Sequence, residues 1–101
     1  MTTEDRERES TIRVKLFAGL RELFGRNDLT VAAEDAPDVA RLLELLSDSP
    51  ERRRGLLDEA GAMREHLIVL RNGRSVGLLG GADAELSPGD EVAVFPPMGG
   101  G

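Results

Sequence analysis

The stretch LSPGDEVAVFPPMGGG, residues 86–101, contains the features that decide the fold. Its SPGD motif (87–90) places proline and glycine at the two central positions of a tight turn. The following residues, EVAVF (91–95), predict a strand with both valines on one face. Pro96 and Pro97 cannot donate ladder hydrogen bonds, so they are expected to end this strand and keep the exit stiff and extended.

The last four residues, 98–101, are predicted to form an extended C-terminal tail. Fully extended, four residues reach roughly 13 Å. Glycine has no Cβ, so a tail ending in three glycines can pass through a narrow channel and be approached closely by another backbone. This composition predicts a chain end that enters the active site of another protein.

Alternation of apolar and polar residues predicts further strands earlier in the chain. With the last strand, the predicted strands are residues 11–17, 27–33, 67–70 and 91–95. Asn72–Gly73 follows the third of them and is the preferred two-residue hairpin turn, because both positions tolerate positive φ. The segment 77–86, GLLGGADAEL, is expected to be a loop.

Apolar residues at helical spacing predict helices between the second and third strands and after the first strand. A short helix is expected at 18–25, the main helix from around 35–37, and a second helix from 49 to about 60, capped by Gly61. The stripe of the main helix is Val39, Leu42, Leu43 and Leu46. The fold class is therefore α+β, with the main helix covering one face of a small mixed sheet.

The composition excludes several classes of function. The chain of 101 residues has no cysteine, which excludes disulfides, thiol catalysis and cysteine-ligated metals, and one histidine, His66, makes a metal site improbable. A net charge of −6 argues against nucleic acid as a partner. No segment suits a signal peptide or a membrane span, so a cytoplasmic location is expected. Residues 1–10 are expected to be a disordered charged extension of a domain at 11–97.

Three stretches of the chain resemble the MoaD family of ubiquitin-like sulfur carriers, within the MoaD/ThiS superfamily. They are VKLFAGLRELFG, the hairpin VLRNGR and the closing LSPGDEVAVFPPMGGG. The resemblance runs from about Thr11 to Gly101 and implies a β-grasp fold, with a mixed sheet of about four to five strands over one main helix. In this family two residues separate the prolines from the terminal glycine pair. Here they are Met98 and Gly99, so Gly101 matches the terminus of the family.

The resemblance implies a function in molybdenum or tungsten cofactor synthesis. Many family members are the small subunit of molybdopterin synthase. A MoeB-like enzyme of the ubiquitin-activating type would use ATP to adenylate the Gly101 carboxylate, and a persulfide sulfurtransferase would supply sulfur to give a thiocarboxylate. The slim tail, with Gly99 and Gly100, would then enter a MoaE-like large subunit, expected as a heterotetramer, which transfers the sulfur to a pyranopterin precursor. The chain would be a co-substrate with no catalytic group, bound cofactor or metal of its own.

The resemblance also implies a docking face. Phe17, Arg21, Leu79 and Phe95 match contact positions of the family. The two phenylalanines could equally belong to the core. The arginine run at 52–54 is interpreted as a solvated face of the second helix.

Other functions remain open. A ThiS-like carrier for thiamine shares the terminal Gly-Gly, but such chains are typically shorter and lack the Phe-Pro-Pro close. Archaeal small modifiers resemble the chain closely and attach their terminal glycine to lysines of target proteins. Lys15 is the only lysine of this chain, so long chains of such a modifier are not expected. A passive ubiquitin-like binding module would need no free terminus.

Overall fold

Strands β1 (Thr11–Leu16) and β5 (Glu91–Phe95) run parallel at the middle of a mixed sheet in the computed structural model, which describes residues 10–65, 67–78 and 80–96. Within these residues the sheet has five strands in the order β2-β1-β5-β3-β4. β2 (Asp28–Ala32) pairs antiparallel with β1, and β3 (Ile68–Arg71) pairs antiparallel with both β5 and β4 (Arg74–Ser75). The predicted mixed sheet is therefore confirmed.

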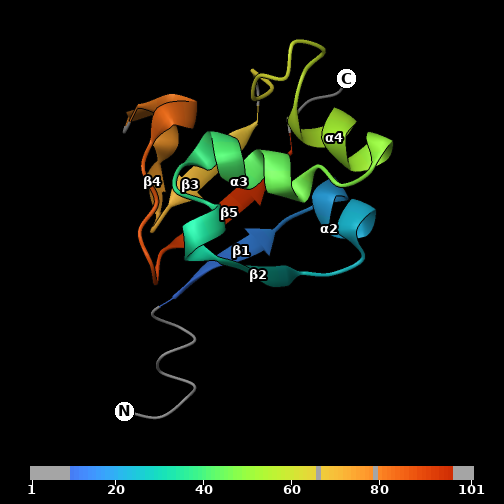
Figure 1. Cartoon of the computed structure of the whole chain (residues 1–101). Helices are drawn as coiled ribbons and strands as arrows, with labels where there is room; N and C mark the ends of the chain where they lie inside the picture. The colour runs from blue at the N-terminus through green and yellow to red at the C-terminus, as the bar shows by residue number, and fades with distance from the viewer. Residues whose placement is uncertain (1–9, 66, 79, 97–101) are drawn as a thin grey trace.

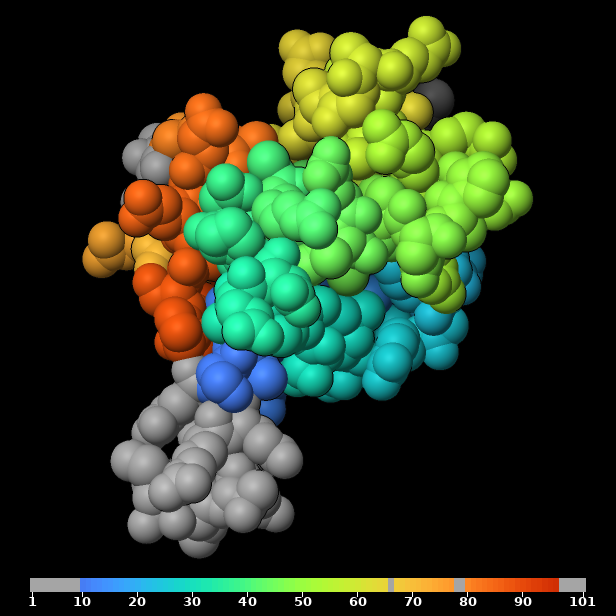
Figure 2. All heavy atoms as spheres, viewed as in Figure 1, coloured from blue at the N-terminus to red at the C-terminus, as the bar shows by residue number. Residues whose placement is uncertain are grey.

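The helices lie over one face of this sheet (Figure 1). They are α2 (Gly19–Phe24), α3 (Val39–Leu46) and α4 (Pro50–Leu56). Short 3-10 turns occupy η1 (Ala33–Asp35), η2 (Val76–Leu78) and η3 (Gly81–Asp83). The segment predicted as a loop, 77–86, contains η3 and overlaps η2. Seen from the helix side, the spheres of α3 and α4 hide most of the central strands (Figure 2). This arrangement is the β-grasp, ubiquitin-like fold that the resemblance implied, and it agrees with the α+β class predicted from the residue patterns.

The core forms between the helix face of the sheet and the predicted apolar stripe of α3. Alternate strand residues point toward the helices, as the period of two requires. The buried strand residues are Ile12, Val14, Leu16, Val69, Val92 and Val94, and those of α3 are Val39, Leu42, Leu43 and Leu46. The other face of the sheet, called the outer face below, carries no helix among the described residues.

Helix α3 begins later than the predicted start at 35–37. Its N-cap is Asp38, whose Oδ1 accepts a hydrogen bond of 2.8 Å from the Arg41 N–H. Asp35 and Asp38 are equally suitable caps by sequence. The choice is made by tertiary contact, because the Val39 N–H donates to the Ala84 carbonyl at 3.0 Å.

Helix α4 ends before the predicted residue 60. It begins as expected, with Ser49 as N-cap and proline in the first turn. Leu57 is extended, bridges to Met63 and buries its side chain in the core. Burying this leucine as an extended residue stops the helix, and Gly61, at φ 82°, serves the turn that follows instead of capping a helix.

The predicted hairpin turn is confirmed, and it is held in place from β5. Asn72 and Gly73 have φ values of 50° and 83°. The Asn72 Nδ2 donates to the Asp90 carboxylate at 2.9 Å, and its Oδ1 accepts from the Glu91 N–H at 2.9 Å. The amide of Asn72 therefore ties the turn to the start of β5.

Asp90 is the buried charged residue among those described, with 8% of its surface exposed. Its carboxylate also accepts from the Ser87 N–H and from Arg71 Nε, each at 2.7 Å. Burial raises the pKa of Asp90, but these donors, the Asn72 amide and the Arg71 charge more than offset it, and the pKa lies below its ordinary value of 3.8. The predicted SPGD turn is thus closed by its own aspartate.

Residues 10–65, 67–78 and 80–96 include no helix with the length and apolar character needed to cross a bilayer. The predicted extension at 1–10 and tail at 98–101 fall almost wholly outside the described residues, as does His66. The predicted division of the chain therefore stays a prediction.

Candidate docking face and tail exit

The chain leaves the sheet at the end of β5, beside the end of β1. Phe95 is the last strand residue, and Pro96 lies outside the ladder, as predicted. The parallel register continues one residue past β1, because the Phe17 N–H donates to the Val94 carbonyl at 3.2 Å. The last described residue, Pro96, therefore follows β5 at the same end of the sheet as Phe17.

Phe17 and Phe95 stack on the outer face. Their ring centroids are 4.3 Å apart, the rings are inclined by 10°, and both side chains are half-buried. Neither ring belongs to the core cluster beneath the helices. An aromatic pair on the outer face is typical of a surface that another protein covers, since tyrosine, tryptophan and phenylalanine are enriched in interfaces.

Two further apolar residues extend this surface onto β3. Ile68 lies directly opposite Phe95 in the register of β3 and β5, and Leu70 lies opposite Ala93. Ile68 is 45% exposed, and it is the large hydrophobic residue in the exposed class within the described part of the chain. We call Phe17, Ile68, Leu70, Ala93 and Phe95 the docking face.

Ile68 and Leu70 were not predicted as site residues. The sequence LIVL (67–70) is apolar at every position, so it supplies both faces of β3 at once. In a sheet covered by helices on one face, a strand that is apolar on both faces points to a partner on the other. That signal was present in the sequence.

Arg21 and Lys15 place positive charge near the docking face. Arg21 is exposed on α2, directly after the loop that follows Phe17. Lys15 lies beside Ala93 in the parallel register, and its Nζ is 3.3 Å from Glu91 Oε1. Leu79, the remaining predicted contact, and the tail residues Gly99 to Gly101 lie outside the described residues.

Ala18 has strained backbone geometry at this end of the sheet. Its φ is 53° and its ψ is −130°, a region that favours glycine. The Arg21 N–H donates to the Ala18 carbonyl at 3.0 Å, which closes the first turn of α2. A strained backbone conformation persists only where neighbouring contacts hold it in place. Ala18 follows Phe17 directly, so this strained residue adjoins the docking face.

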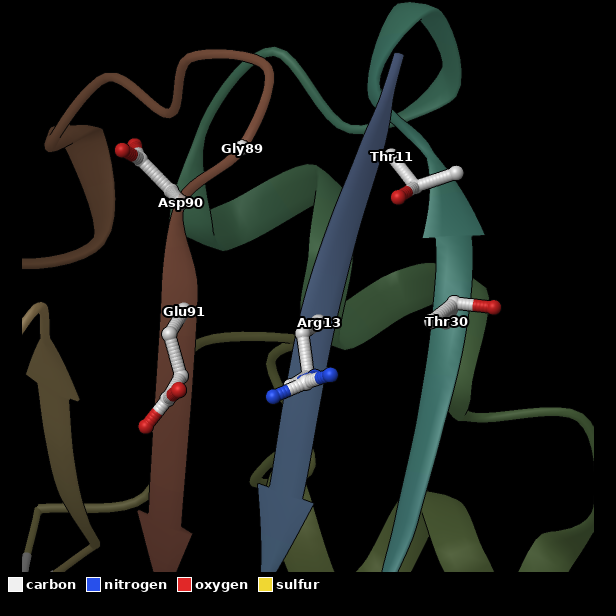
Figure 3. A pocket seen from close by; sticks show the side chains of 6 residues that line it. All are labelled: Thr11, Arg13, Thr30, Gly89, Asp90 and Glu91. Atoms are coloured by element: carbon white, nitrogen blue, oxygen red, sulfur yellow. The ribbon is translucent and has the colours of Figure 1, made fainter. Parts of the chain in front are cut away.

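The opposite end of the outer face is polar. A shallow pocket of about 300 Å³ spans β5, β1 and β2 there (Figure 3). Arg13 lies between Glu91 and Thr30 in this view, and the Asp90 carboxylate points away from Arg13 toward its own partners (Figure 3). The polar side chains that line the pocket are two threonines, one arginine and two carboxylates.

Arg52 is half-buried, although the arginine run at 52–54 was predicted to be a solvated face of the second helix. Its guanidinium lies 4.6 Å from the centroid of the Phe24 ring and pairs with Asp48 at 2.9 Å. Arg53 and Arg54 are exposed, as predicted. Arg52 therefore helps to cover the contact between α4 and α2.

The described residues contain no cluster of side chains suited to binding a metal ion. No three His, Cys, Asp or Glu side chains of residues 10–65, 67–78 and 80–96 lie close enough together to hold an ion. What these residues assemble is a partly exposed apolar sheet face beside Pro96, the last residue described.

Comparison with known proteins agrees with this geometry. Residues 14–101 match the ThiS family. The chain belongs to this family. Small archaeal modifier protein 3 of Haloferax volcanii is 36% identical over 90 residues, which cover 89% of this chain and 98% of that protein. The molybdopterin synthase sulfur carrier subunit of Escherichia coli K12 is 36% identical over 90 residues, covering 89% and 99%.

A solved structure gives the same fold. SAMP1 from Haloferax volcanii superposes with a TM-score of 0.75 at 30% identity, covering 90% of this chain and 99% of that one. The resemblance found in the sequence is thus confirmed at the level of the ubiquitin-like ThiS/MoaD superfamily. Members of this family by name include both a sulfur carrier and protein modifiers.

Proposed function

We propose that this protein is a sulfur carrier for molybdopterin synthesis, with the Gly101 carboxylate as its working group. The observation that supports this proposal is that the docking face lies beside Pro96, at the end of the sheet. Phe17, Ile68 and Phe95 form an apolar surface at the end of the sheet from which the chain leaves through Pro96. A partner that covers this surface would receive the tail at the same time.

Sulfur transfer begins with activation of a poor electrophile. The Gly101 carboxylate attacks the α-phosphorus of ATP and pyrophosphate leaves, giving an acyl-adenylate. Sulfide then attacks the acyl carbon and AMP leaves, giving a thiocarboxylate. With a persulfide donor, the terminal sulfur of the persulfide displaces AMP and gives an acyl disulfide. A second thiol of the donor then attacks the donor's own sulfur in that bond, which forms a donor disulfide and releases the thiocarboxylate. The chain is a co-substrate in both steps, and the adenylating enzyme binds the ATP.

The partners follow from these two steps. We propose a MoeB-like adenylating enzyme and a MoaE-like large subunit in a heterotetramer, both meeting the docking face in the cytoplasm. The name of the Escherichia coli relative, a molybdopterin synthase sulfur carrier subunit, supports this assignment. Phe17, Phe95, Arg21 and Leu79 would contact these partners, with Ile68 added from the structure. Gly99 and Gly100 have no side chains and would pass through a narrow channel of the partner.

Intact mass tests the carrier function. The full chain is incubated with a MoeB-like enzyme, ATP and sulfide, and we expect the mass increase for replacement of one oxygen by sulfur. The product should then convert a pyranopterin precursor in the presence of a MoaE-like subunit. A chain lacking Gly101 should gain no sulfur, and Gly100→Leu should block transfer by obstructing tail entry. Normal thiocarboxylation and transfer by Gly100→Leu would overturn the assigned role of the tail.

Protein modification is the second candidate, because two relatives at 36% identity are named as small archaeal modifiers. In this case a lysine amine of a target would attack the same acyl-adenylate and form an isopeptide bond. Isopeptide conjugates in a cell extract, absent when Gly101 is deleted, would establish this function. Thiocarboxylation without transfer to a pyranopterin precursor would point to the ThiS-like carrier for thiamine.

A further inference from the structure

Strand β2 forms one border of the sheet, and its outward backbone groups face away from β1. The Leu16 N–H donates to the Asn27 carbonyl and the Ala33 N–H donates to the Ser10 carbonyl, each at 2.8 Å. Because an antiparallel ladder alternates, every second residue between these bonds points away from the sheet. The outward residues are Asp28, Thr30 and Ala32.

No described helix or strand lies beyond β2 (Figure 1). Natural proteins protect such edges with proline, lysine or a bulge. The sequence of β2, DLTVA, contains neither residue, and its register with β1 continues through five pairs without interruption. The edge is therefore suited to pairing with another strand.

The residues around Thr30 are complementary to their own sequence. We propose that a second copy of this chain pairs with the β2 edge, antiparallel, about a two-fold axis at Thr30. In this register the two Thr30 residues face each other, and each Asp28 lies opposite Ala32 of the other copy. The three outward residues of each copy then exchange both backbone hydrogen bonds with their opposites.

Apolar side chains match in this register. Leu29 and Val31 point to the helix side of the sheet, where both are half-buried against the core of one copy. Pairing at Thr30 places Leu29 of each copy opposite Val31 of the other. Directly opposite residues have Cβ atoms about 4.5–5.5 Å apart, so each pair covers surface that a single copy leaves exposed.

Opposite charges match as well. Arg26 and Glu34 are both exposed and lie at equal sequence distances from Thr30, on either side. Both lie just outside β2, Arg26 in the bend before it and Glu34 in η1 after it. The two-fold axis therefore brings the positive flank of each β2 edge to the same end as the negative flank of the other, and does so twice. Asp28 meets no acidic residue directly, because it faces Ala32 of the second copy and Lys15 of its own β1.

The dimer leaves the docking face free. The two-fold axis is perpendicular to the sheet, so both outer faces point to the same side. β2 is separated from β5 by β1, and Ile68 on β3 lies farther still. This inference does not depend on the proposed function. It predicts a bivalent molecule that presents two docking faces to one side, with the two chain exits at opposite ends.

Sedimentation equilibrium of the full chain up to millimolar concentration tests this pairing. We expect reversible dimerisation with a dissociation constant on the order of 100 µM to 1 mM, because the edge is short and each copy carries a net charge of −6. A chain that stays monomeric throughout this range would overturn the proposal.

Variants at the flanking charges decide which surface pairs. Glu34→Arg makes both flanks of each β2 edge positive, so like charges meet at each end of the paired strands, and it should weaken the dimer by about tenfold. Adding Arg26→Glu to this variant exchanges the two charges and should restore the original affinity. Glu59→Arg makes the same charge change in an exposed loop far from β2 in sequence and is the matched control. Equal affinity for Glu34→Arg and Glu59→Arg would overturn the proposed register.

Hydrogen exchange reports the edge directly. The amides of Asp28, Thr30 and Ala32 should become protected as concentration rises, while Leu29 and Val31 should be protected at all concentrations by β1. Thr30→Pro removes the central outward donor without removing a bond to β1 and should abolish dimerisation. Protection of the outward amides that is independent of concentration would show that the same chain covers this edge, and would overturn the proposal.

Discussion

The two ends of the outer face differ although the central strands β1 and β5 run through both. At the tail exit the outward residues are Phe17, Ile68 and Phe95, and at the far end they are Arg13, Thr30 and Glu91. Burial in the core explains neither set, because both lie on the face without helices. Among the residues named, the apolar side chains of the uncovered sheet face thus lie near Pro96, and an exposed apolar patch of this kind is typical of a surface that binds another protein.

Stability and docking should therefore separate between these two ends. The polar end adjoins the Asp90 cluster, whose hydrogen bonds join β3 to the start of β5, and the apolar end is the surface that we propose partners contact. Variants at each end test whether the two properties are independent.

Asp90→Ala should have the largest effect, on stability alone. It leaves Arg71, Asn72 and the Ser87 N–H without their shared acceptor, and we expect a loss of about 3 kcal/mol in the free energy of unfolding. Urea denaturation measures this loss. Binding to the adenylating enzyme should be unchanged for the folded fraction, and weakened binding would show that the two ends are not independent.

Acid should act through the same carboxylate. Because the folded pKa of Asp90 lies below its ordinary value of 3.8, ionised Asp90 stabilises the fold above that value. This stability is lost as the pH falls through the lower, folded pKa. Asp90→Asn should therefore lose less stability than the wild type between pH 5 and about pH 2. Urea denaturation of both proteins across this range measures the difference. Identical pH profiles would show that Asp90 does not cause the loss of stability in acid.

Ile68→Asp should have the next largest effect, on docking alone. Its side chain is 45% exposed, so unfolding should change little, whereas a charge at the centre of an apolar contact should weaken partner binding by about 30-fold, or roughly 2 kcal/mol. Isothermal titration with the adenylating enzyme measures the affinity. Thr30→Asp, an exposed position at the polar end of the same face, is the matched control and should bind normally.

The Phe17–Phe95 stack should contribute a smaller coupling. A double-mutant cycle with Phe17→Leu and Phe95→Leu should give a coupling energy of about 1 kcal/mol in the free energy of unfolding, because the rings are 4.3 Å apart and nearly parallel. A coupling indistinguishable from zero would indicate that the rings serve contact with partners and not the fold.

Ala18→Gly should have the smallest effect and should stabilise the protein. Glycine relieves the strain of φ 53° but adds entropy to the unfolded chain, so we expect a net gain of about 0.5 kcal/mol. Thermal unfolding measures the gain. A clear destabilisation would mean that the alanine side chain makes a packing contact that outweighs the strain.

Local patterns in the sequence predicted most of the fold. Alternation identified β1, β2 and β5, and the Asn72–Gly73 pair identified the hairpin. The start of α3 could not be predicted, since Asp35 and Asp38 are equivalent caps until Val39 bonds to Ala84. The end of α4 likewise depends on burial of Leu57, which only the folded chain provides.

The candidate site was predictable in part. The family resemblance pointed to Phe17 and Phe95 as contact positions and left the core as an equal alternative, and the structure places both outside the core and stacked. Ile68 could not be singled out, because all four residues of LIVL (67–70) are apolar and the sequence does not show which of them face away from the helices. The pairing of β3 with β5 decides this. The Asp90 cluster joins residues 71, 72, 87 and 90, and only the pairing of β3 with β5 brings its two halves together.

The parallel pairing of β1 with β5 has a consequence for synthesis of the protein. These central strands lie at residues 11–16 and 91–95, so the middle of the sheet cannot close until residue 95 has emerged from the ribosome. Contacts so distant in sequence also slow folding. The Phe17–Phe95 stack exists only once both strands are in place. A partner that binds the stack would thus distinguish a finished domain from a nascent chain.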